Sequence, residues 1–306
     1  MIVNTIKFFD WFNASFTDTI IRTMPFKHVL CYGTLNPDLI YYVDSLPTSG
    51  GDIRSTKYKI RPGGTAINCA ENINNWSLMV SVGGNSLAND ALGNYLLNYL
   101  DNLSINHDLI NTNSKNTPTC SIFVEDNGER TIVSSGYKDS IWSNLNSLNR
   151  FDSLLIDRYS ISYIRENLKD IKRNNNIFLV QAGYEEEIDY EIDFLVVSKN
   201  EIEVYEANKI LENNLAKYIL LTSSNLPARL LGKEGVIEIV PPDFNSIDST
   251  GAGDCTAAYI AAFGNEEIID VVKKACAAGA ILAGTNELPS ISKIQEISKL
   301  VEVNPR

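Results

Sequence analysis

The chain has 306 residues, of which 44% are hydrophobic and 21% are charged, and it carries a formal net charge of −12 at pH 7. This length is sufficient for one large core with a small appended unit, and the composition excludes the disordered and fibrous classes. An acidic chain without a run of Lys and Arg lacks the electrostatic footprint of a nucleic-acid-binding protein. We therefore expect no nucleic acid among its partners.

The five cysteines are scattered along the chain and form no C-x-x-C pair. Their odd number and their spacing indicate neither a disulfide framework nor a zinc site. No apolar run reaches the roughly 18 residues that a membrane span requires, and the N-terminus lacks a basic start followed by an unbroken apolar stretch. These features predict a cytoplasmic protein without a membrane partner.

Residues 1–27 predict an amphipathic helical extension. Apolar residues recur there at spacings of three and four: Ile2, Ile6, Phe9, Phe12, Phe16 and Ile20. A membrane-surface helix would be richer in Lys and Arg, so this stripe favours packing on the same domain or on a second subunit. A homodimer is the expected assembly.

From residue 28 the sequence alternates between strand-like and helix-like segments. A buried strand over 28–33 ends in a glycine turn, and a second apolar stretch over 39–43 follows it. Residues 44–62 favour short exposed strands, and a glycine pair at 63–64 begins a helix over 65–74. Further strands are predicted over 78–82, 119–124, 130–133, 153–156, 177–180, 194–197 and 218–222, and a further helix over about 90–100. Asn127-Gly128 predicts a hairpin turn between two of these strands.

This order predicts an α/β fold with a doubly wound, mostly parallel sheet flanked by helices and with a small β-sheet lid. The large domain is expected to comprise 28–40, 63–116 and 141–306, and the lid 41–62 and 117–140.

The segment Asp248-Ser249-Thr250-Gly251-Ala252-Gly253-Asp254 precedes a helical run of small residues. Backbone N–H groups at a helix start have no intrahelical partner, so Gly251, Ala252 and Gly253 can cradle a phosphoryl group. A carboxylate at the next position repels phosphate but suits the general base for an alcohol nucleophile. Taken alone, Asp254 could instead only cap the helix or complement its dipole.

The full pattern D-x-T-G-A-G-D before an Ala-rich helix resembles the C-terminal signature of the ribokinase/PfkB carbohydrate kinase family. The resemblance extends from residue 28 to about residue 290. The segment 33–38 resembles the family's first strand and substrate loop, and the segment 63–70 its N-terminal signature of a Gly-Gly pair followed by an Asn.

The resemblance implies a ribokinase-like fold and an ATP-dependent kinase that uses Mg²⁺, with a monovalent cation as a further candidate cofactor. It implies Asp254 as catalytic base and the amides of Gly251, Ala252 and Gly253 as the anion hole. The implied acceptor residues are Asn36, Asp38, Gly63, Gly64 and Asn68, and the implied nucleotide residues are Asn200, Glu203, Thr222, Asp248 and Thr250. Glu203 is expected to hold Mg²⁺ through water.

Two of these assignments rest on local spacing. Asn200 and Glu203 form an N-x-x-E motif whose i, i+3 spacing predicts one helix face near the phosphates, with a solvated helix start as the alternative. Asn68, one turn into its helix, offers a donor and an acceptor to a polyol, with solvation on the helix surface as the alternative.

The chain departs from the family at its nucleotide loop. Thr222 is kept, but the glycine of the usual Thr-x-Gly loop is absent. The choice between ATP and another nucleoside triphosphate therefore stays open at this stage.

Arg158 is a candidate that the resemblance does not supply. It follows a predicted strand, and strand carboxyl ends face the ligand crevice in open α/β sheets. An inward Arg158 would favour an acceptor with a carboxylate or phosphate, whereas an outward one would only be a surface residue.

The acceptor is expected to be a small molecule, namely a sugar or a sugar derivative. A nucleoside kinase of the same family is the alternative, and an aromatic or apolar platform beside Asn36 and Asp38 would favour it. A catalytically silent ligand-binding regulator is a rival from another class, but its mark would be the loss of Asp254, which is present.

Overall fold

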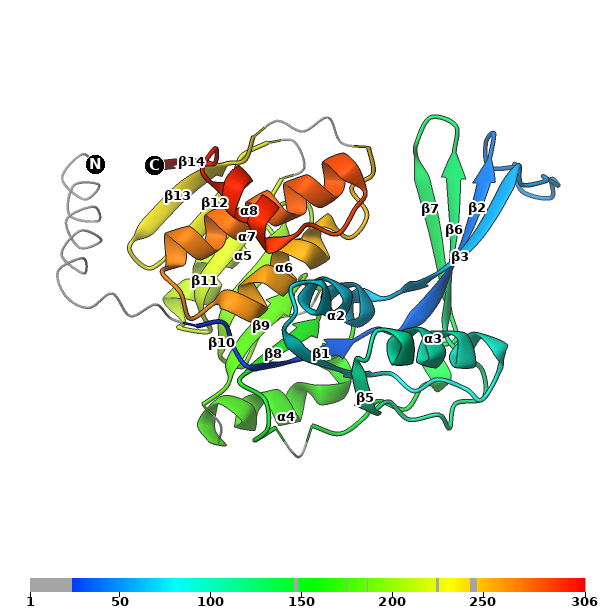
Figure 1. Ribbon diagram of the computed structural model, residues 1–306, viewed down its shortest axis with the longest axis horizontal. Helices are drawn as coiled ribbons and strands as arrows, with labels where there is room; N and C mark the ends of the chain where they lie inside the picture. Colours follow the sequence, from blue (N-terminus) through cyan, green and yellow to red (C-terminus); the bar gives the residue numbers. More distant parts are fainter. Residues whose placement is uncertain are drawn as a thin grey trace.

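The computed structural model describes residues 24–145, 148–174, 176–185, 187–223, 226–242 and 247–305 (Figure 1). Most of the helix predicted within 1–27 therefore lies outside the described residues.

The described residues form a ten-stranded sheet in the order β14-β13-β12-β11-β10-β9-β8-β1-β4-β5. The strands are β1 (His28–Gly33), β4 (Met79–Gly84), β5 (Asn106–Leu109), β8 (Ser153–Asp157), β9 (Phe178–Ala182), β10 (Ile192–Ser198), β11 (Ala216–Thr222), β12 (Ala228–Gly232), β13 (Gly235–Val240) and β14 (Glu302–Pro305). Neighbours from β5 to β11 run parallel, whereas β12, β13 and β14 extend the sheet with antiparallel pairs. The predicted doubly wound, mostly parallel sheet is confirmed, and the antiparallel extension was not predicted.

Helices cover both faces of this sheet (Figure 1). They are α2 (Thr65–Asn75), α3 (Ala91–Asn102), α4 (Ile161–Asn174), α5 (Val204–Glu212), α6 (Ala252–Phe263), α7 (Ile268–Thr285) and α8 (Ile291–Ser298), with a 3₁₀ turn, η1 (Tyr137–Asp139). Strand residues alternate between the two faces. On β8, Leu155 packs in the cluster of α2, α6 and α7, whereas Leu154 and Ile156 pack in the cluster of α4 and α5.

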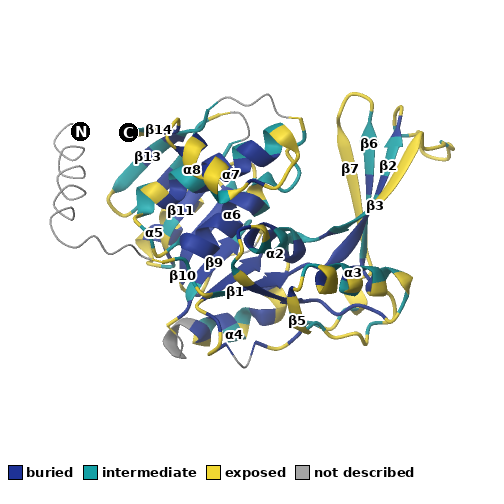
Figure 2. Ribbon diagram, viewed as in Figure 1, coloured by how far each residue is buried: buried dark blue, intermediate teal, exposed yellow. Residues whose placement is uncertain are grey.

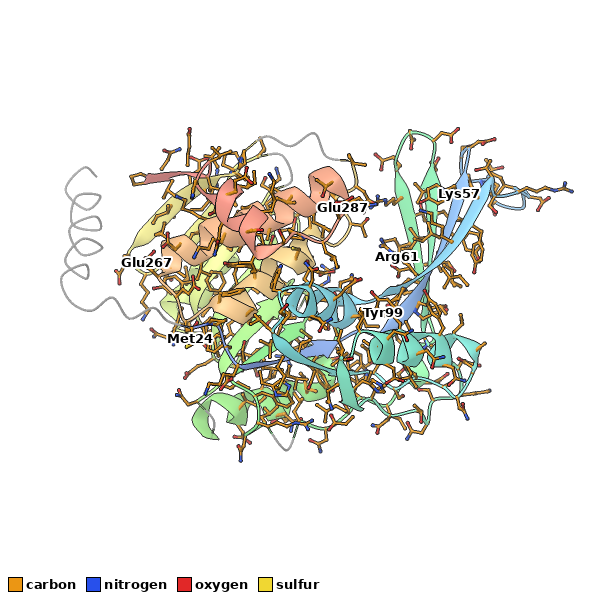
Figure 3. All side chains as sticks on the ribbon, viewed as in Figure 1. Met24, Lys57, Arg61, Tyr99, Glu267 and Glu287 are labelled. Carbon is orange, nitrogen blue, oxygen red and sulfur yellow. The ribbon has the colours of Figure 1, made fainter. Side chains whose placement is uncertain are left out.

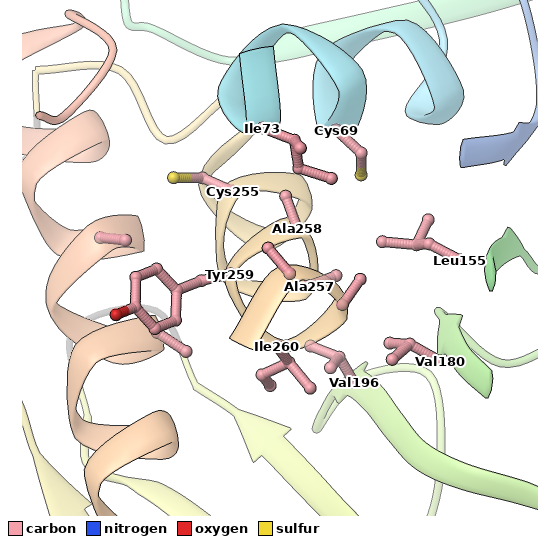
Figure 4. Close-up of a cluster of buried hydrophobic side chains, with 14 of the residues drawn as sticks. Cys69, Ile73, Leu155, Val180, Val196, Cys255, Ala257, Ala258, Tyr259 and Ile260 are labelled. Atoms are coloured by element: carbon pink, nitrogen blue, oxygen red, sulfur yellow. The ribbon is translucent and has the colours of Figure 1, made fainter. Parts of the chain in front are cut away.

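Helix α6 is buried along its length because it lies between the sheet, α2 and α7. Every residue from 255 to 263 is buried, and small side chains such as Ala257 and Ala258 allow the close approach of its neighbours (Figure 4). The α6 N-terminus is therefore fixed by the core of the protein.

The strand order reverses beside β1. This strand pairs with β4 on one side and with β8 on the other, so the chain leaves the centre of the sheet in both directions. In open α/β sheets the crevice beyond the carboxyl ends of such strands is the usual ligand site.

A separate four-stranded sheet has the order β3-β2-β6-β7 and projects from the large domain (Figure 1). Its strands are β2 (Asn36–Val43), β3 (Lys57–Gly63), β6 (Thr119–Glu125) and β7 (Arg130–Ser135). The predicted hairpin of residues 119–133 is its β6–β7 pair. Strand β2 begins at Asn36, three residues before the predicted apolar stretch, so the two polar residues expected in a loop lie on the small sheet.

The small sheet is much more exposed than the large one (Figure 2). All six residues of β7 are exposed, whereas all five residues of β8 are buried. Within the described residues no helix has the length and apolar character of a bilayer span. The five cysteines are free.

Candidate active site

The signature motif places Asp254 in the first turn of α6. Gly251, the N-cap, adopts a left-handed conformation with φ of 79°, which glycine accepts without strain. A Cβ atom on Gly253 would meet open space, and Gly253 lines a pocket together with Asp254. Gly253 and the Asp254 carboxylate therefore border the same space at a helix N-terminus, where anions bind readily.

Asn68, from the N-terminal signature, holds the side chain of Asp254. Asn68 on α2 donates a hydrogen bond from Nδ2 to Asp254 Oδ2 at 2.8 Å. Burial raises the pKa of Asp254 to about 6, the Asn68 hydrogen bond acts in the opposite direction, and the carboxylates of Asp157 and Asp38 add to the rise. A carboxylate that titrates this close to neutral pH is a stronger base than an ordinary Asp and is still ionised at neutral pH.

The predicted acceptor residues Asn36 and Asp38 lie at the start of β2. Asn36 donates from Nδ2 to Asp38 Oδ1 at 2.8 Å and accepts a hydrogen bond from the Tyr137 hydroxyl at 2.7 Å. Arg61 on β3 donates from Nε to Asp38 Oδ2 at 3.1 Å. Figure 3 shows Arg61 nearer to α2 than Lys57, which lies further out on the same strand. Burial raises the pKa of Asp38, and Arg61 and Asn36 partly offset this rise.

The glycine pair makes room for these groups. A Cβ atom on Gly63 would lie 2.4 Å from Asp38 Oδ1, and one on Gly64 would lie 2.2 Å from the carbonyl oxygen of Thr34. Gly64 also has φ of 89°. A side chain at either position would therefore collide with Asp38 or with the Thr34 backbone. The close approach of an acceptor to these glycines stays a prediction.

Asp157 is a buried carboxylate that the sequence analysis did not identify. It ends β8, and its Oδ2 accepts hydrogen bonds from the backbone and the hydroxyl of Thr34, both at 2.7 Å. Its Oδ1 accepts from the backbone of Ser160 at 2.8 Å. Thr34 Oγ1 in turn accepts from the backbone of Thr65 at 3.1 Å, at the start of α2. Through Thr34, Asp157 thus connects the carboxyl ends of β1 and β8 to α2, the helix whose Asn68 bonds Asp254.

A pocket of about 260 Å³ lies at the carboxyl ends of β8 to β11. Its lining includes four predicted site residues, Arg158, Thr222, Gly253 and Asp254. A larger pocket of about 520 Å³ lies between α5 and the β12–β13 hairpin, and no predicted site residue lines it. We take the smaller pocket as the candidate site because it contains the helix N-terminus and the carboxylate.

Arg158 lines this pocket but does not present a free charge there. Its guanidinium pairs with Glu201, donates a hydrogen bond to the Tyr159 hydroxyl at 2.6 Å and lies over the Tyr159 ring. Gly183, with φ of 83°, gives space to the aliphatic part of Arg158. The inward orientation places the Arg158–Glu201 pair, rather than an isolated cation, beside the pocket.

The predicted helix face of Asn200 and Glu203 is wrong. Helix α5 begins only at Val204, and Asn200 lies in the preceding turn. Glu203 is the N-cap of α5 and forms a capping box with Glu206. The acid that lines the pocket from this segment is Glu201, which also accepts a hydrogen bond from the backbone of Ser198 at 2.9 Å.

Asp248 and Thr250 are in contact with the small sheet. Arg130, the first residue of β7, donates from Nη2 to Asp248 Oδ1 at 2.5 Å and from Nη1 to Thr250 Oγ1. Burial acts to raise the pKa of Asp248, but hydrogen bonds from Thr250 and Arg130 lower it. The loop that begins at Asp248 is thus connected to β7, whose Arg130 lies 118 residues earlier in the chain.

The residues that sequence reasoning missed are Arg61, Arg130, Asp157 and Glu201. Asp157 had a usable signal, because it precedes Arg158 at the same strand end. Glu201 lies within the N-x-x-E motif itself. Arg130 and Arg61 gave no local signal, because their partners lie on other elements.

The acidic groups near the pocket fit a phosphate-bridging Mg²⁺ ion only in part. Mg²⁺ at such sites takes one or two carboxylates and otherwise phosphate and water oxygens. Glu201 and Asp254 line the pocket, whereas the described residues contain no cluster of three or more His, Cys, Asp or Glu that would bind a metal alone. The described part of the pocket thus offers two carboxylates, of which Glu201 is already paired with Arg158 and the backbone of Ser198.

Comparison with known structures shows the ribokinase fold. A ribokinase from Thermotoga maritima superposes with a TM-score of 0.76 at 18% identity, over 90% of this chain and 99% of that one. A nucleoside kinase from Methanocaldococcus jannaschii gives 0.73 at 19% identity, over 90% and 99%. Ribokinase from Arabidopsis thaliana complexed with ribose and ATP gives 0.73 at 17% identity, over 90% and 99%. Identities this low show a shared fold.

A family model matches part of the sequence. Residues 27–171 match the model of the pfkB family carbohydrate kinases. No curated protein gives a significant match. The chain thus carries a PfkB family domain over residues 27–171 on a ribokinase fold.

Proposed function

We propose that the protein catalyses ATP-dependent phosphorylation of a hydroxyl group of a sugar or a sugar derivative. The observation that carries this proposal is the position of Asp254, which combines a pKa raised to about 6 with a place beside the amides of an α6 N-terminus. Solved ribokinase relatives in complex with ATP or ADP support ATP as the donor.

In this mechanism Asp254 accepts the proton of the acceptor hydroxyl as its oxygen attacks the γ-phosphate. Asn68 orients the carboxylate through its hydrogen bond to Oδ2. The amides of Gly251 and Gly253 would stabilise the negative charge that is shared among the phosphoryl oxygens, and that of Ala252 would join them on leaving its 3.2 Å bond to the Ser249 carbonyl oxygen. Mg²⁺, when bound, would neutralise phosphate charge, with Glu201 as the nearby carboxylate that replaces the predicted Glu203.

The acceptor would lie between the large and the small sheet. Asn36 and Asp38 are hydrogen-bonding groups at the start of the small sheet, and the charge of Asp38 reaches Asp254. Closure of the small sheet would exclude water, which otherwise competes with the acceptor for the phosphoryl group. The small sheet would thus serve as the lid that the sequence predicts.

A nucleoside acceptor is the second candidate, and one observation favours it. Ile40 and Ile122 are 7% and 8% exposed and lie on the same face of the small sheet as Asp38, in adjacent strands. Their side chains are nearly covered in this structure, so they would meet a base or another apolar ring only if their cover moved. A free sugar would use less of such an apolar surface.

A coupled ADP-release screen tests the proposed function. The acceptors are hexoses, pentoses, sugar acids, sugar phosphates and nucleosides, and Asp254→Asn serves as the blank. We expect Asp254-dependent ADP release with at least one acceptor. Release that is equal in the wild-type protein and the blank for every acceptor would contradict the proposal.

Arg158→Ala refines the acceptor class within the same screen. If Arg158 leaves Glu201 to bind an acidic acceptor, its loss reduces turnover of a sugar acid or sugar phosphate by about tenfold more than turnover of a neutral sugar. Equal losses would remove Arg158 from acceptor recognition.

A further inference from the structure

Arg130 connects the small sheet, which carries Asp38, with the loop of residues 248–251, which would bind phosphate under the proposed function. Its guanidinium bonds both side chains that precede the Gly251 turn, Asp248 and Thr250. Asp248 Oδ1 also accepts the backbone N–H of Thr250 at 2.8 Å. One carboxylate oxygen therefore orders the loop and anchors the arginine.

Arg130 projects from the face of the small sheet that carries Asp38. Arg130 pairs with Val124, which pairs with Tyr42. Tyr42 lies four residues beyond Asp38 along β2, so the two side chains point to the same face. The acceptor carboxylate and the bridging guanidinium thus face the same side. The face of the small sheet that binds the acceptor is the face that Arg130 ties to the large domain.

Without a cationic partner, the negative charge of Asp248 would weaken the binding of a nucleotide phosphate at the α6 N-terminus. Asp248 lies three residues before Gly251, and a polyphosphate bound at the α6 N-terminus would be repelled by a nearby carboxylate. The ion pair is partly shielded from solvent, with side-chain exposures of 30% for Arg130 and 25% for Asp248. An arginine that offers two donors to this loop neutralises the carboxylate and holds it in place.

We infer that Arg130 is a positioning residue that makes closure of the small sheet and neutralisation of the phosphate loop one event. The inference rests on the proposed function, because it assigns the loop to a phosphate ligand. When the small sheet is closed, Asp248 is paired and the α6 N-terminus is ready for the nucleotide. When the sheet opens, Asp248 is unpaired and nucleotide affinity falls.

The test uses Arg130→Gln, Asp248→Asn and the double variant of the full chain. Gln removes the charge of Arg130, and Asn keeps an oxygen that can accept the Thr250 N–H. Lys59→Ala is the matched control, because Lys59 is a cation on the same face that lies over the ring of Tyr42. The readouts are hydrogen exchange of residues 119–135 without nucleotide and the Kd of Mg²⁺-ADP by calorimetry.

Arg130→Gln is expected to raise exchange of the β6–β7 hairpin roughly three- to tenfold and to weaken ADP binding by a similar factor, as expected for a partly exposed ion pair. The double variant should exchange as fast as Arg130→Gln but bind ADP nearly as tightly as the wild-type protein, because no unpaired carboxylate is left. At roughly 0.5 M salt the hairpin exchange of the wild-type protein should approach that of Arg130→Gln.

Two results would overturn the inference. One is wild-type exchange and affinity in Arg130→Gln, and the other is ADP binding in the double variant that is as weak as in Arg130→Gln. Neither readout depends on an acceptor or on turnover. If the wild-type protein does not bind ADP, the proposed function fails, whereas hairpin exchange still decides whether Arg130 holds the small sheet.

Discussion

The two sheets of this protein contribute opposite properties to one site. The large sheet is covered by helices on both faces, and its strand β8 is entirely buried. The small sheet projects from it, and its strand β7 is entirely exposed. Asp254 belongs to the first region and Asp38 to the second.

Under the proposed function, this difference puts the catalytic base on the buried sheet and the acceptor residues on the exposed one. Asp254 lies in the first turn of a helix that is packed between the sheet, α2 and α7, so its position depends on the global stability of the fold. Asp38 lies at the buried start of β2, in a sheet whose outer strand β7 is entirely exposed. Phosphoryl transfer depends on positioning, and the contact of Arg130 with the signature loop gives the second region a defined closed position.

The largest expected difference between the two sheets is in stability. Leu155→Ala removes a fully buried side chain of β8 and should lower the free energy of unfolding by about 3 kcal/mol. Val133→Ala on β7, where Val133 is 52% exposed, should change it by about 0.5 kcal/mol or less. Denaturant unfolding measures both values. Equal losses would show that the small sheet is as tightly packed as the large one.

Gly253→Ala should separate activity from stability within the large domain. An added methyl group meets no neighbouring atom but enters the space beside the anion hole, so kcat/KM for ATP should fall about 10²-fold. The Tm should rise by about 1 °C, because Ala favours a helix over Gly. Steady-state kinetics and thermal unfolding check the two parts. A lower Tm together with the lower activity would mean that the variant had disturbed the fold instead.

Asp38→Asn should affect the reaction of the acceptor and not the binding of the nucleotide. The loss of a charged hydrogen-bonding group should lower kcat/KM for the acceptor by roughly 10- to 100-fold and leave the Kd for ADP unchanged. The kinetics use an acceptor from the screen, with Lys59→Ala as control on the same face. A matching loss of ADP affinity would show that the small sheet does not act on acceptor binding separately.

The pH dependence should follow Asp254. A base works only when ionised, and the pKa of Asp254 is raised to about 6. The value of kcat/KM should therefore fall tenfold per unit as the pH drops below about 6 and stay level just above it. As a control, ionisation of Asp254 costs stability above its folded pKa, so Asp254→Asn should have the higher Tm above about pH 6 and lose this advantage below about pH 4. A rate that is level down to pH 5 would contradict the assignment.

The sequence predicted the elements of the fold where a pattern is local. Continuous apolar runs identified the buried strands, and Gly251 with the small residues after it identified α6. The antiparallel strands β12 to β14 were missed. Strand β14 pairs with β13 through partners as distant as Ile239 and Val303, which leave no local trace, whereas β12 and β13 form a local hairpin that was not assigned. The i, i+3 spacing of Asn200 and Glu203 predicted a helix face, but the capping box of Glu203 delays the helix to Val204.

The candidate site was predictable to the same extent. The roles of Asp254 and Asn68 were expected from separate motifs, and the structure adds the hydrogen bond between them. Asp157 had a signal in its place before Arg158 at a strand end, but its bond to Thr34 joins residues more than 100 positions apart and leaves no local pattern. The contact of Arg130 with Asp248 is equally distant in the chain and depends on how the two sheets are placed relative to each other.

The turnover of Asp254→Asn tests the central claim most directly. The substitution keeps the size of the side chain and an oxygen for Asn68, but it removes the base. With an acceptor from the screen, kcat should fall by roughly 10² or more, while the Kd for ATP stays within about threefold of the wild-type value. Turnover near the wild-type rate would show that Asp254 is not the base that activates the acceptor.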